Sequence, residues 1–249
     1  MKNIKNIKNS SLKKSSIYLL LVVLAIYLLS ISFVIAVPAS PSLTYVSNTT
    51  FTSSLTNRST DVKGTITTIT LSSNQQDYKW KAYVGNVTGR FVLDDAAGKS
   101  IYDWSTGAIT GEVYVSRFSN VNWGSVACVN QTVIDSEQVG LGMSSSVKDN
   151  INSTFNYTNH GNFSVGTTPI SGCRSTATYI NDAAQVMGPS ALFQEVLLRD
   201  TLTSNLVYTA IINSSVTGYN GQSYDFQMII GENESASIPT PYYFWVELG

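Results

Sequence analysis

The chain has 249 residues, of which only 12% are charged, and a formal net charge of −1. Five of its 15 Lys and Arg, and none of its 16 Asp and Glu, precede residue 40. The rest therefore has ten basic against sixteen acidic residues, which argues against nucleic acid or anionic lipid as its partner.

Residues 1–37 predict export of the rest of the chain. Five lysines precede residue 15, and residues 17–37 form a run in which only Ser30 and Ser32 are strongly polar. As a helix, this run would be about 30 Å long, which is enough to cross a bilayer. Because the lysines stay on the cytoplasmic side, the remainder is expected outside the cell or on its surface.

Two fates of this segment are open. Val34-Ile35-Ala36 and Val37-Pro38-Ala39 each place a small residue at a possible cut with Val two positions before it, which favours a cleaved signal peptide. The apolar run exceeds the usual signal length of about 7–15 residues, which favours an uncleaved membrane anchor. In the second case the membrane is a partner of the chain.

A Ser/Thr-rich segment, residues 38–62, comes next. Its composition predicts an extended stalk, because it offers too little apolar surface to offset the entropy of ordering. Residues 63–249 are then expected to form a β-rich extracellular domain. Residues 64–71 are dominated by β-branched side chains, which predicts a first strand, and 62–72 are a candidate donor strand for filament assembly.

The next elements read as an antiparallel meander. Residues 91–94 and 101–104 predict a hairpin around the Gly-containing loop 95–99, and residues 109–118 alternate as a further strand. Residues 193–199, 206–212 and 224–230 also alternate, residues 242–248 are expected to form a last strand, and Asn220-Gly221 is a favoured hairpin turn.

One short helix interrupts this pattern. Met143, Val147, Ile151 and Phe155 form an apolar stripe that predicts about three helical turns, while glycines at 140 and 142 disfavour an earlier helix. The predicted fold is therefore mainly β, an antiparallel β-sandwich or barrel-like domain with one short helix.

Cysteines and sequons agree with an exported location. Cys128 and Cys173 predict one disulfide in an oxidising compartment. Beyond the apolar run, nine Asn-x-Ser/Thr sequons suit a glycosylated surface protein. They begin at Asn48, Asn57, Asn86, Asn130, Asn152, Asn156, Asn162, Asn213 and Asn233.

The sequence lacks the residue patterns of common cofactor-binding and metal-binding sites, so no cofactor or metal is expected. The sequence 94–100 ends like a phosphate-binding loop, but Leu93 stands where the first glycine belongs. Zinc would have to use His160, the sole histidine, together with two distant cysteines. We expect His160 to be an exposed loop residue.

Acids and aromatic residues leave two kinds of site open. A glycoside-cleaving pair of carboxylates would come from a set of acids near strands or loops. These are Asp94, Asp95, Asp103, Glu112, Glu195 and Asp225. Aromatic side chains in loops stack on sugars, and the candidates are Trp104, Trp123, Tyr219 and Trp245.

Several stretches resemble parts of uncharacterised exported archaeal proteins. They are residues 80–89, 93–95, 101–104, 193–198 and 224–227. The resemblance covers most of 79–249 and implies an exported location, and it implies a catalytic role for none of these residues.

The sequence thus predicts a non-enzymatic secreted or cell-surface protein with a structural or adhesive role. Glycans or other surface proteins are the expected partners. One alternative is a carbohydrate-binding module that uses loop aromatics, and a second is a glycoside-active enzyme with a carboxylate pair.

Overall fold

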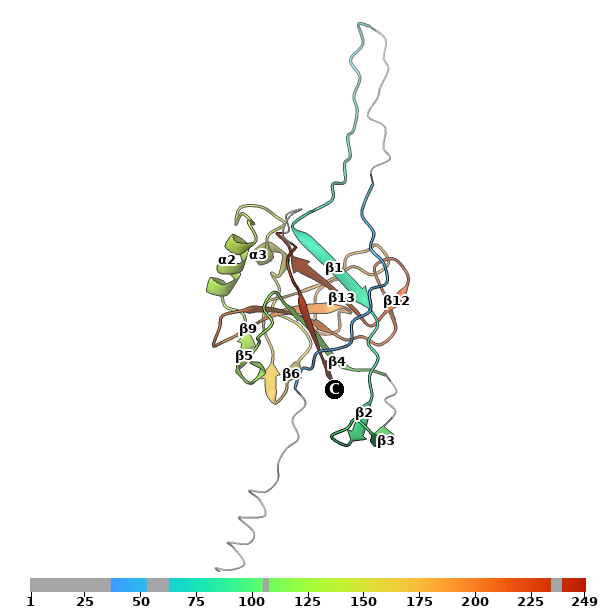
Figure 1. Ribbon diagram of the computed structural model, residues 1–249. Helices are drawn as coiled ribbons and strands as arrows, with labels where there is room; N and C mark the ends of the chain where they lie inside the picture. Colours follow the sequence, from blue (N-terminus) through green and yellow to red (C-terminus); the bar gives the residue numbers. More distant parts are fainter. Residues whose placement is uncertain (1–36, 53–62, 105–107, 234–238) are drawn as a thin grey trace, which may run out of the picture. The chain divides into compact units, whose positions relative to one another are not determined.

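The computed structural model describes residues 37–52, 63–104, 108–233 and 239–249 (Figure 1). The predicted signal or anchor segment therefore lies outside the described residues, except for Val37, and so does the sequon at Asn57. Within the described ranges, none of the helices has the length and apolar character needed to span a membrane.

The fold is mainly β, with antiparallel sheets, as the sequence predicts. The main sheet has the order β14-β4-β10-β9-β5, and β8 also pairs with β9. Its strands are β4 (Gly111–Ser116), β5 (Val126–Cys128), β8 (Ser175–Ala177), β9 (Gln194–Asp200), β10 (Leu206–Ile211) and β14 (Tyr243–Leu248). The strands predicted at 109–118, 193–199, 206–212 and 242–248 are all confirmed, and all belong to this sheet.

Besides the main sheet, the described residues form four antiparallel pairs of strands. They are β1 (Trp80–Gly85) with β13 (Phe226–Gly231), β2 (Phe91–Asp94) with β3 (Ser100–Trp104), β6 (Phe163–Val165) with β7 (Thr168–Ile170), and β11 (Val216–Thr217) with β12 (Ser223–Tyr224). The hairpin predicted at 91–104 and the turn at Asn220-Gly221 are therefore confirmed.

Alternation along the strands gives the main sheet two apolar faces. On the first face, Val113 and Val115 of β4 share a core with residues of β13 and of the helical region. On the second face, Tyr114 of the same strand packs with Val165 and Ile170 of the β6–β7 hairpin. Figure 1 shows β1 and β13 lying across the sheet.

The helix prediction holds only for the last turn of the stretch 143–155, and it is wrong in the extent and the number of helices. The described part of the chain has two α-helices, α2 (Gln131–Gly140) and α3 (Ile151–Thr154), and a short 3₁₀ helix η1 (Trp123–Ser125). The side chains of Asn130 and Asn150 cap α2 and α3 by accepting from backbone N–H groups three residues later.

Asn150 also explains why the predicted helix does not form across 143–155. Its side-chain amide donates to the carbonyl oxygens of Ser144, Ser145 and Val147, at 3.3, 3.0 and 2.6 Å. These bonds favour a compact loop over a helix. The apolar residues of the expected stripe are used all the same, since Ile151 and Phe155 are fully buried.

Arg117, directly after β4, fixes α2 to the sheet. Its Nε and Nη2 donate to the two carboxylate oxygens of Glu137, at 2.8 and 2.7 Å. Such a bidentate pair sets both distance and orientation.

The strand predicted at 64–71 is not formed: among the described residues, the first strand is β1. Ile66, Ile69 and Leu71 are each at least 60% exposed. High β propensity therefore does not produce a strand here, because propensity reflects packing on a neighbouring strand rather than an intrinsic backbone preference.

Candidate functional site

Two of the four aromatic residues predicted to bind a ligand lie together on the second face of the sheet. The ring centroids of Trp123 and Trp245 are 5.3 Å apart, and Trp123 is 5.0 Å from Tyr114. Trp123 comes from η1, whereas Tyr114 and Trp245 come from the paired strands β4 and β14. The three rings form one aromatic cluster.

The other two aromatic residues lie elsewhere. Trp104 belongs to β3 and packs edge-on against Tyr102, with ring centroids 5.0 Å apart. Tyr219 lies in the loop between β11 and β12 and stacks on Tyr224. The four residues therefore do not form a single binding surface.

An acidic pair lies beside the aromatic cluster. Glu112 of β4 and Glu247 of β14 are direct neighbours in the strand register. The Tyr114 hydroxyl is 2.9 Å from Oε2 of Glu247 and 3.5 Å from Oε2 of Glu112, and the Gly166 N–H donates to the other oxygen of Glu247 at 2.9 Å. Sequence reasoning proposed Glu112 but missed Glu247.

Burial dominates the electrostatics of this pair. Both glutamates are only 7% exposed. Desolvation, followed by the charge of Glu247, raises the pKa of Glu112 to about 8, although the Tyr114 hydroxyl acts in the opposite direction. Burial and the two carboxylates also raise the pKa of Tyr114. At neutral pH Glu112 is therefore mostly protonated.

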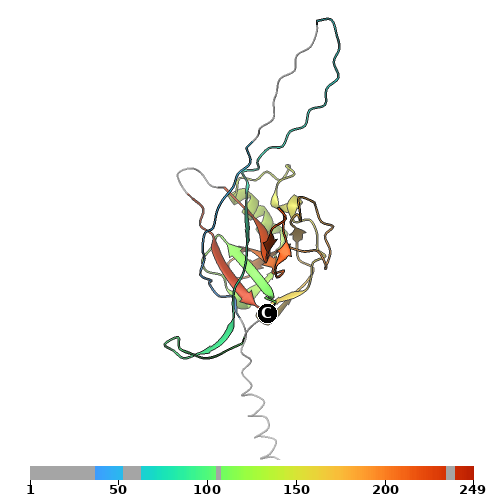
Figure 2. The same ribbon diagram turned by 90° about the vertical axis from the view of Figure 1, so that its right-hand side faces the viewer.

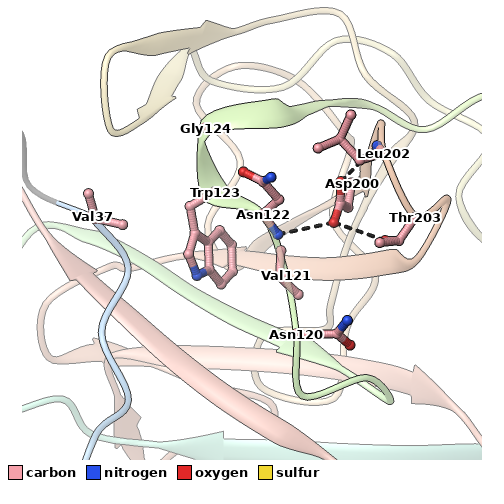
Figure 3. A pocket seen from close by; sticks show the side chains of 9 residues that line it. All are labelled: Val37, Asn120, Val121, Asn122, Trp123, Gly124, Asp200, Leu202 and Thr203. Atoms are coloured by element: carbon pink, nitrogen blue, oxygen red, sulfur yellow. Dashed lines mark hydrogen bonds between the residues drawn. The ribbon is translucent and has the colours of Figure 1, made fainter.

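A hollow of about 570 Å³ opens next to Trp123 (Figure 3). Its lining consists of the loop before η1, the first two residues of η1, the last residue of β9 and the turn after it, and one residue from the start of the described chain. These are Val37, Asn120, Val121, Asn122, Trp123, Gly124, Asp200, Leu202 and Thr203.

Asp200 holds the wall of the hollow in place. Its carboxylate accepts from the backbone N–H groups of Asn122 and Leu202, at 3.0 and 2.8 Å, and from the Thr203 hydroxyl at 2.9 Å. Burial alone would raise its pKa, but these hydrogen bonds lower it overall. Asp200 is thus an ionised carboxylate that already accepts hydrogen bonds from three groups of the chain itself.

The other predicted acids are spread over the molecule. Asp94, Asp95 and Asp103 lie in the β2–β3 hairpin. Glu195 is fully buried on the first face, where it accepts from the Ile229 N–H at 2.9 Å, and burial raises its pKa well above the usual range. Asp225 accepts from two backbone N–H groups and organises turns. The structure pairs Glu112 with none of them.

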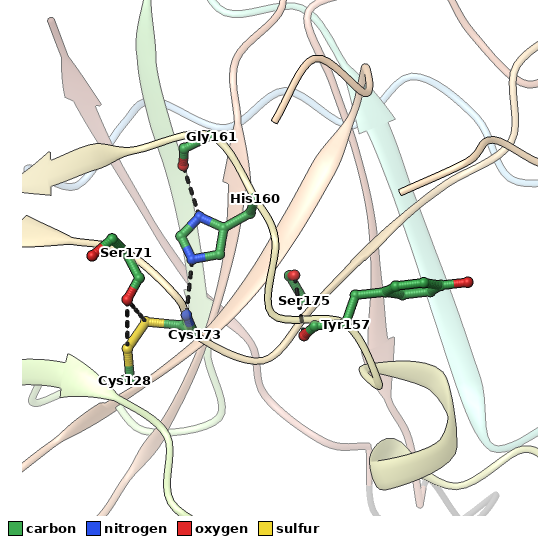
Figure 4. The surroundings of a disulfide bond; sticks show 7 residues. All are labelled: Cys128, Tyr157, His160, Gly161, Ser171, Cys173 and Ser175. Atoms are coloured by element: carbon green, nitrogen blue, oxygen red, sulfur yellow. Dashed lines mark hydrogen bonds between the residues drawn. A yellow bond between two sulfur atoms is a disulfide. The ribbon is translucent and has the colours of Figure 1, made fainter. Parts of the chain in front are cut away.

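The predicted disulfide is present between Cys128 and Cys173, with Cα atoms 5.0 Å apart (Figure 4). It joins β5 to the segment between β7 and β8, and so ties the β6–β7 hairpin region to the sheet. A loop of this length contributes about 4 kcal/mol in the chain-entropy description.

His160 was expected in an exposed loop, and that expectation is wrong. The side chain is only 4% exposed and lies beside the disulfide (Figure 4). Its Nε2 accepts from the Cys173 N–H at 3.0 Å, and its Nδ1 lies 2.7 Å from the Gly161 carbonyl oxygen. The ring satisfies two backbone groups in the interior, so its role is structural.

Most sequons in the described part of the chain are accessible. The exposed asparagines are Asn48, Asn86, Asn130, Asn156, Asn162 and Asn233. Asn152 and Asn213 are half-buried instead. Asn213 Oδ1 accepts from the Phe193 N–H at 2.7 Å, and Asn152 Oδ1 is buried, so these two sequons are less accessible than the others.

The β2–β3 hairpin presents an uncovered apolar surface. Phe91 pairs with Trp104 and Leu93 with Tyr102, so these four side chains share one side of the ribbon, and each is 42–59% exposed. The opposite side bears the Arg90–Asp103 ion pair together with the exposed side chains of Val92 and Ile101. We call the four residues the ribbon face. In both Figures 1 and 2 the hairpin projects away from the main sheet.

Neither a search for metal-ligand clusters nor comparison with known proteins adds a candidate site. In the described ranges, His, Cys, Asp and Glu form no group that could hold a metal ion. Comparisons with protein-family models, curated proteins and solved structures find no match.

Proposed function

We propose that this chain is a non-enzymatic secreted or cell-surface protein with a structural or adhesive role, and that it acts by binding further copies of itself. The ribbon face carries the proposal. An isolated two-stranded ribbon is marginally stable in water, and one with an uncovered apolar side gains stability when another surface packs on it. The apolar leader and the disulfide support an exported location, and the layering of β1–β13 on the main sheet supports a sandwich-like fold.

The same chain supplies a matching segment. Residues 64–71 carry Ile66, Ile69 and Leu71 as exposed side chains among threonines, with no charged residue between Lys63 and Asp77. Such a segment suits addition to a strand edge, where the backbone gives affinity and alternate side chains give specificity. Added to an edge of the β2–β3 ribbon, the segment would place Ile69 and Leu71 on one side, where they can extend the ribbon face. A second copy of this chain is therefore the partner that we assign to the ribbon face and its edge.

The positions of donor and acceptor favour an open assembly. Residues 64–71 precede β1, which begins at Trp80, and the ribbon comes after β1, which ends at Gly85. Donor and acceptor are different surfaces, so each added copy presents a new acceptor. Contacts of this head-to-tail kind form filaments, or rings if the rotation closes.

The acidic pair favours a structural role over catalysis. Glu112 and Glu247 are bonded to Tyr114 and Gly166 and are almost fully buried. A glycosidic bond would have to reach between them, as the glycoside-active alternative requires. That approach would displace the β6–β7 hairpin from the second face.

Self-assembly is tested with paired variants of the exported chain. Tyr102→Ser/Trp104→Ser weakens the acceptor, Ile69→Asp weakens the donor, and Val139→Ser is a control at an 81% exposed position of α2. Sedimentation velocity and electron microscopy are expected to show multimers for the wild type and the control only.

Mixing the two weakened chains separates exchange between molecules from pairing within one molecule. One chain keeps an intact donor and the other an intact acceptor, so the mixture is expected to form dimers that grow no further. A mixture that stays monomeric, or a wild type that is monomeric at every concentration, contradicts the proposal.

Carbohydrate binding is a second candidate function, favoured by the hollow beside Trp123. An aromatic ring with the amides of Asn120 and Asn122 and the Thr203 hydroxyl is a combination that stacks on and hydrogen-bonds to sugars. A glycan array tests it. The wild type is expected to bind a glycan saturably. Asn120→Ala should abolish this binding, and the control Trp104→Ala should leave it intact. Unchanged binding by Asn120→Ala would contradict this function.

A further inference from the structure

The outer edge of β14 carries a short piece of chain from the start of the described residues. The Ala39 N–H donates to the Val246 carbonyl oxygen at 3.0 Å, and the Val246 N–H donates to the Ala39 carbonyl oxygen at 2.9 Å. The two residues form an antiparallel bridge. Because β14 pairs with β4 on its other side, residue 39 extends the main sheet.

The neighbours of Ala39 are also part of the domain. Pro38 is buried, and Val37 lines the hollow beside Trp123 (Figure 3). Proline lacks an N–H and is tolerated at sheet edges, where it also blocks the addition of further strands. Residues 37–39 therefore cover the middle of an edge strand that would otherwise present its N–H and C=O groups to other chains.

This arrangement distinguishes between the two possible cuts in the leader. Cleavage after Ala39 would remove all three residues, together with the bridge to Val246. Cleavage after Ala36 would leave all three in place. We propose that the leader is removed by hydrolysis of the Ala36–Val37 peptide bond, so that the mature chain begins at Val37. Water supplies the hydroxyl for the new Ala36 carboxylate and the hydrogen for the new Val37 amine.

Folding protects the second cut once the first is made. A protease must hold the residues around its cut in an extended form, but Ala39 is held by two hydrogen bonds in the folded domain. Ala36 supplies the small residue at the first cut, with Val34 two positions before it, and Ala39 and Val37 have the same pattern at the second, so the bridge to Val246 is what distinguishes the two cuts. The inference rests on the exported location given under the proposed function.

The test uses the full chain, expressed in a host with an export pathway and a signal peptidase. The protein is recovered from the medium and from the membrane, cytoplasmic and other cell fractions, and its N-terminus is read by intact mass and sequencing. A chain beginning at Val37 is expected. In exported protein, a chain that begins at Ser40 or retains Met1 overturns the inference and leaves export intact. Retention of the whole chain in the cytoplasm overturns export itself.

Two matched variants assign the cut to one alanine. Ala36→Leu replaces the small residue at the proposed cut and is expected to accumulate uncleaved precursor. Ala39→Leu changes an exposed side chain whose role in the bridge is through the backbone, and it is expected to give the same Val37 terminus as the wild type. Normal processing of Ala36→Leu together with loss of processing in Ala39→Leu overturns the inference.

Discussion

We expect the free energy of unfolding to fall as pH rises from 5 to 9, and the Glu112→Gln variant to lose most of that fall. Burial, and then the charge of Glu247, raises the pKa of Glu112 from 4.5 to about 8. Between these values the folded chain keeps the proton and the unfolded chain releases it, so rising pH favours the unfolded state. At about 1.4 kcal/mol per pKa unit, the loss between pH 5 and pH 9 is about 4 kcal/mol.

Urea unfolding followed by tryptophan fluorescence at five pH values measures this dependence. Glu195 also has a raised pKa, so the informative quantity is the difference between the wild type and Glu112→Gln at each pH. Asp182→Asn is the control, because Asp182 is exposed and has a φ of 61°, which asparagine also adopts. Parallel pH profiles for the wild type and Glu112→Gln would refute the reasoning.

Three further changes address other parts of the fold. Replacing Cys128 and Cys173 by serine is expected to lower the free energy of unfolding by about 4 kcal/mol, measured by denaturant titration, and an unchanged midpoint would contradict the structural role of the bond. His160→Leu leaves the Cys173 N–H without its acceptor and is expected to cost about 1–3 kcal/mol with the disulfide intact, as the same titration would show. Arg117→Ala leaves a buried carboxylate unpaired and is expected to lower the free energy of unfolding by about 3 kcal/mol, measured by thermal unfolding. Arg90→Ala is the control, because Arg90 belongs to an exposed ion pair, and it should lower this free energy by less than about 1 kcal/mol. Equal losses in the two variants would contradict the role of burial.

The strands of the main sheet could be predicted because their signal is local. Each of β4, β9, β10 and β14 alternates between side chains for the two faces, and a period of two is visible in any single strand. Which strands become neighbours depends on the whole fold. Glu247 was missed for that reason, since it becomes a partner of Glu112 only when β14 lies beside β4.

The errors in the helical region also have particular causes. The apolar residues from Met143 to Phe155 are mostly buried, as their spacing predicts. The spacing of buried residues does not by itself determine whether the backbone between them is helical. One side chain, Asn150, binds three carbonyl groups and fixes a loop in the middle of the stripe. His160 was misjudged because its flanking Asn and Gly residues suggest a loop, and a loop beside a disulfide can still be buried.

The bridge between Ala39 and Val246 has a mechanical consequence for the Ser/Thr-rich segment. The chain is hydrogen-bonded to the sheet at Ala39, and β1 begins at Trp80, so the Ser/Thr-rich segment lies between two points of attachment and is not in series with the domain. A pull applied at the N-terminus would load the two Ala39–Val246 hydrogen bonds first. Tension would reach the Ser/Thr-rich segment only after those bonds break. Only then would the segment be stretched and lengthen the connection between the N-terminus and the domain.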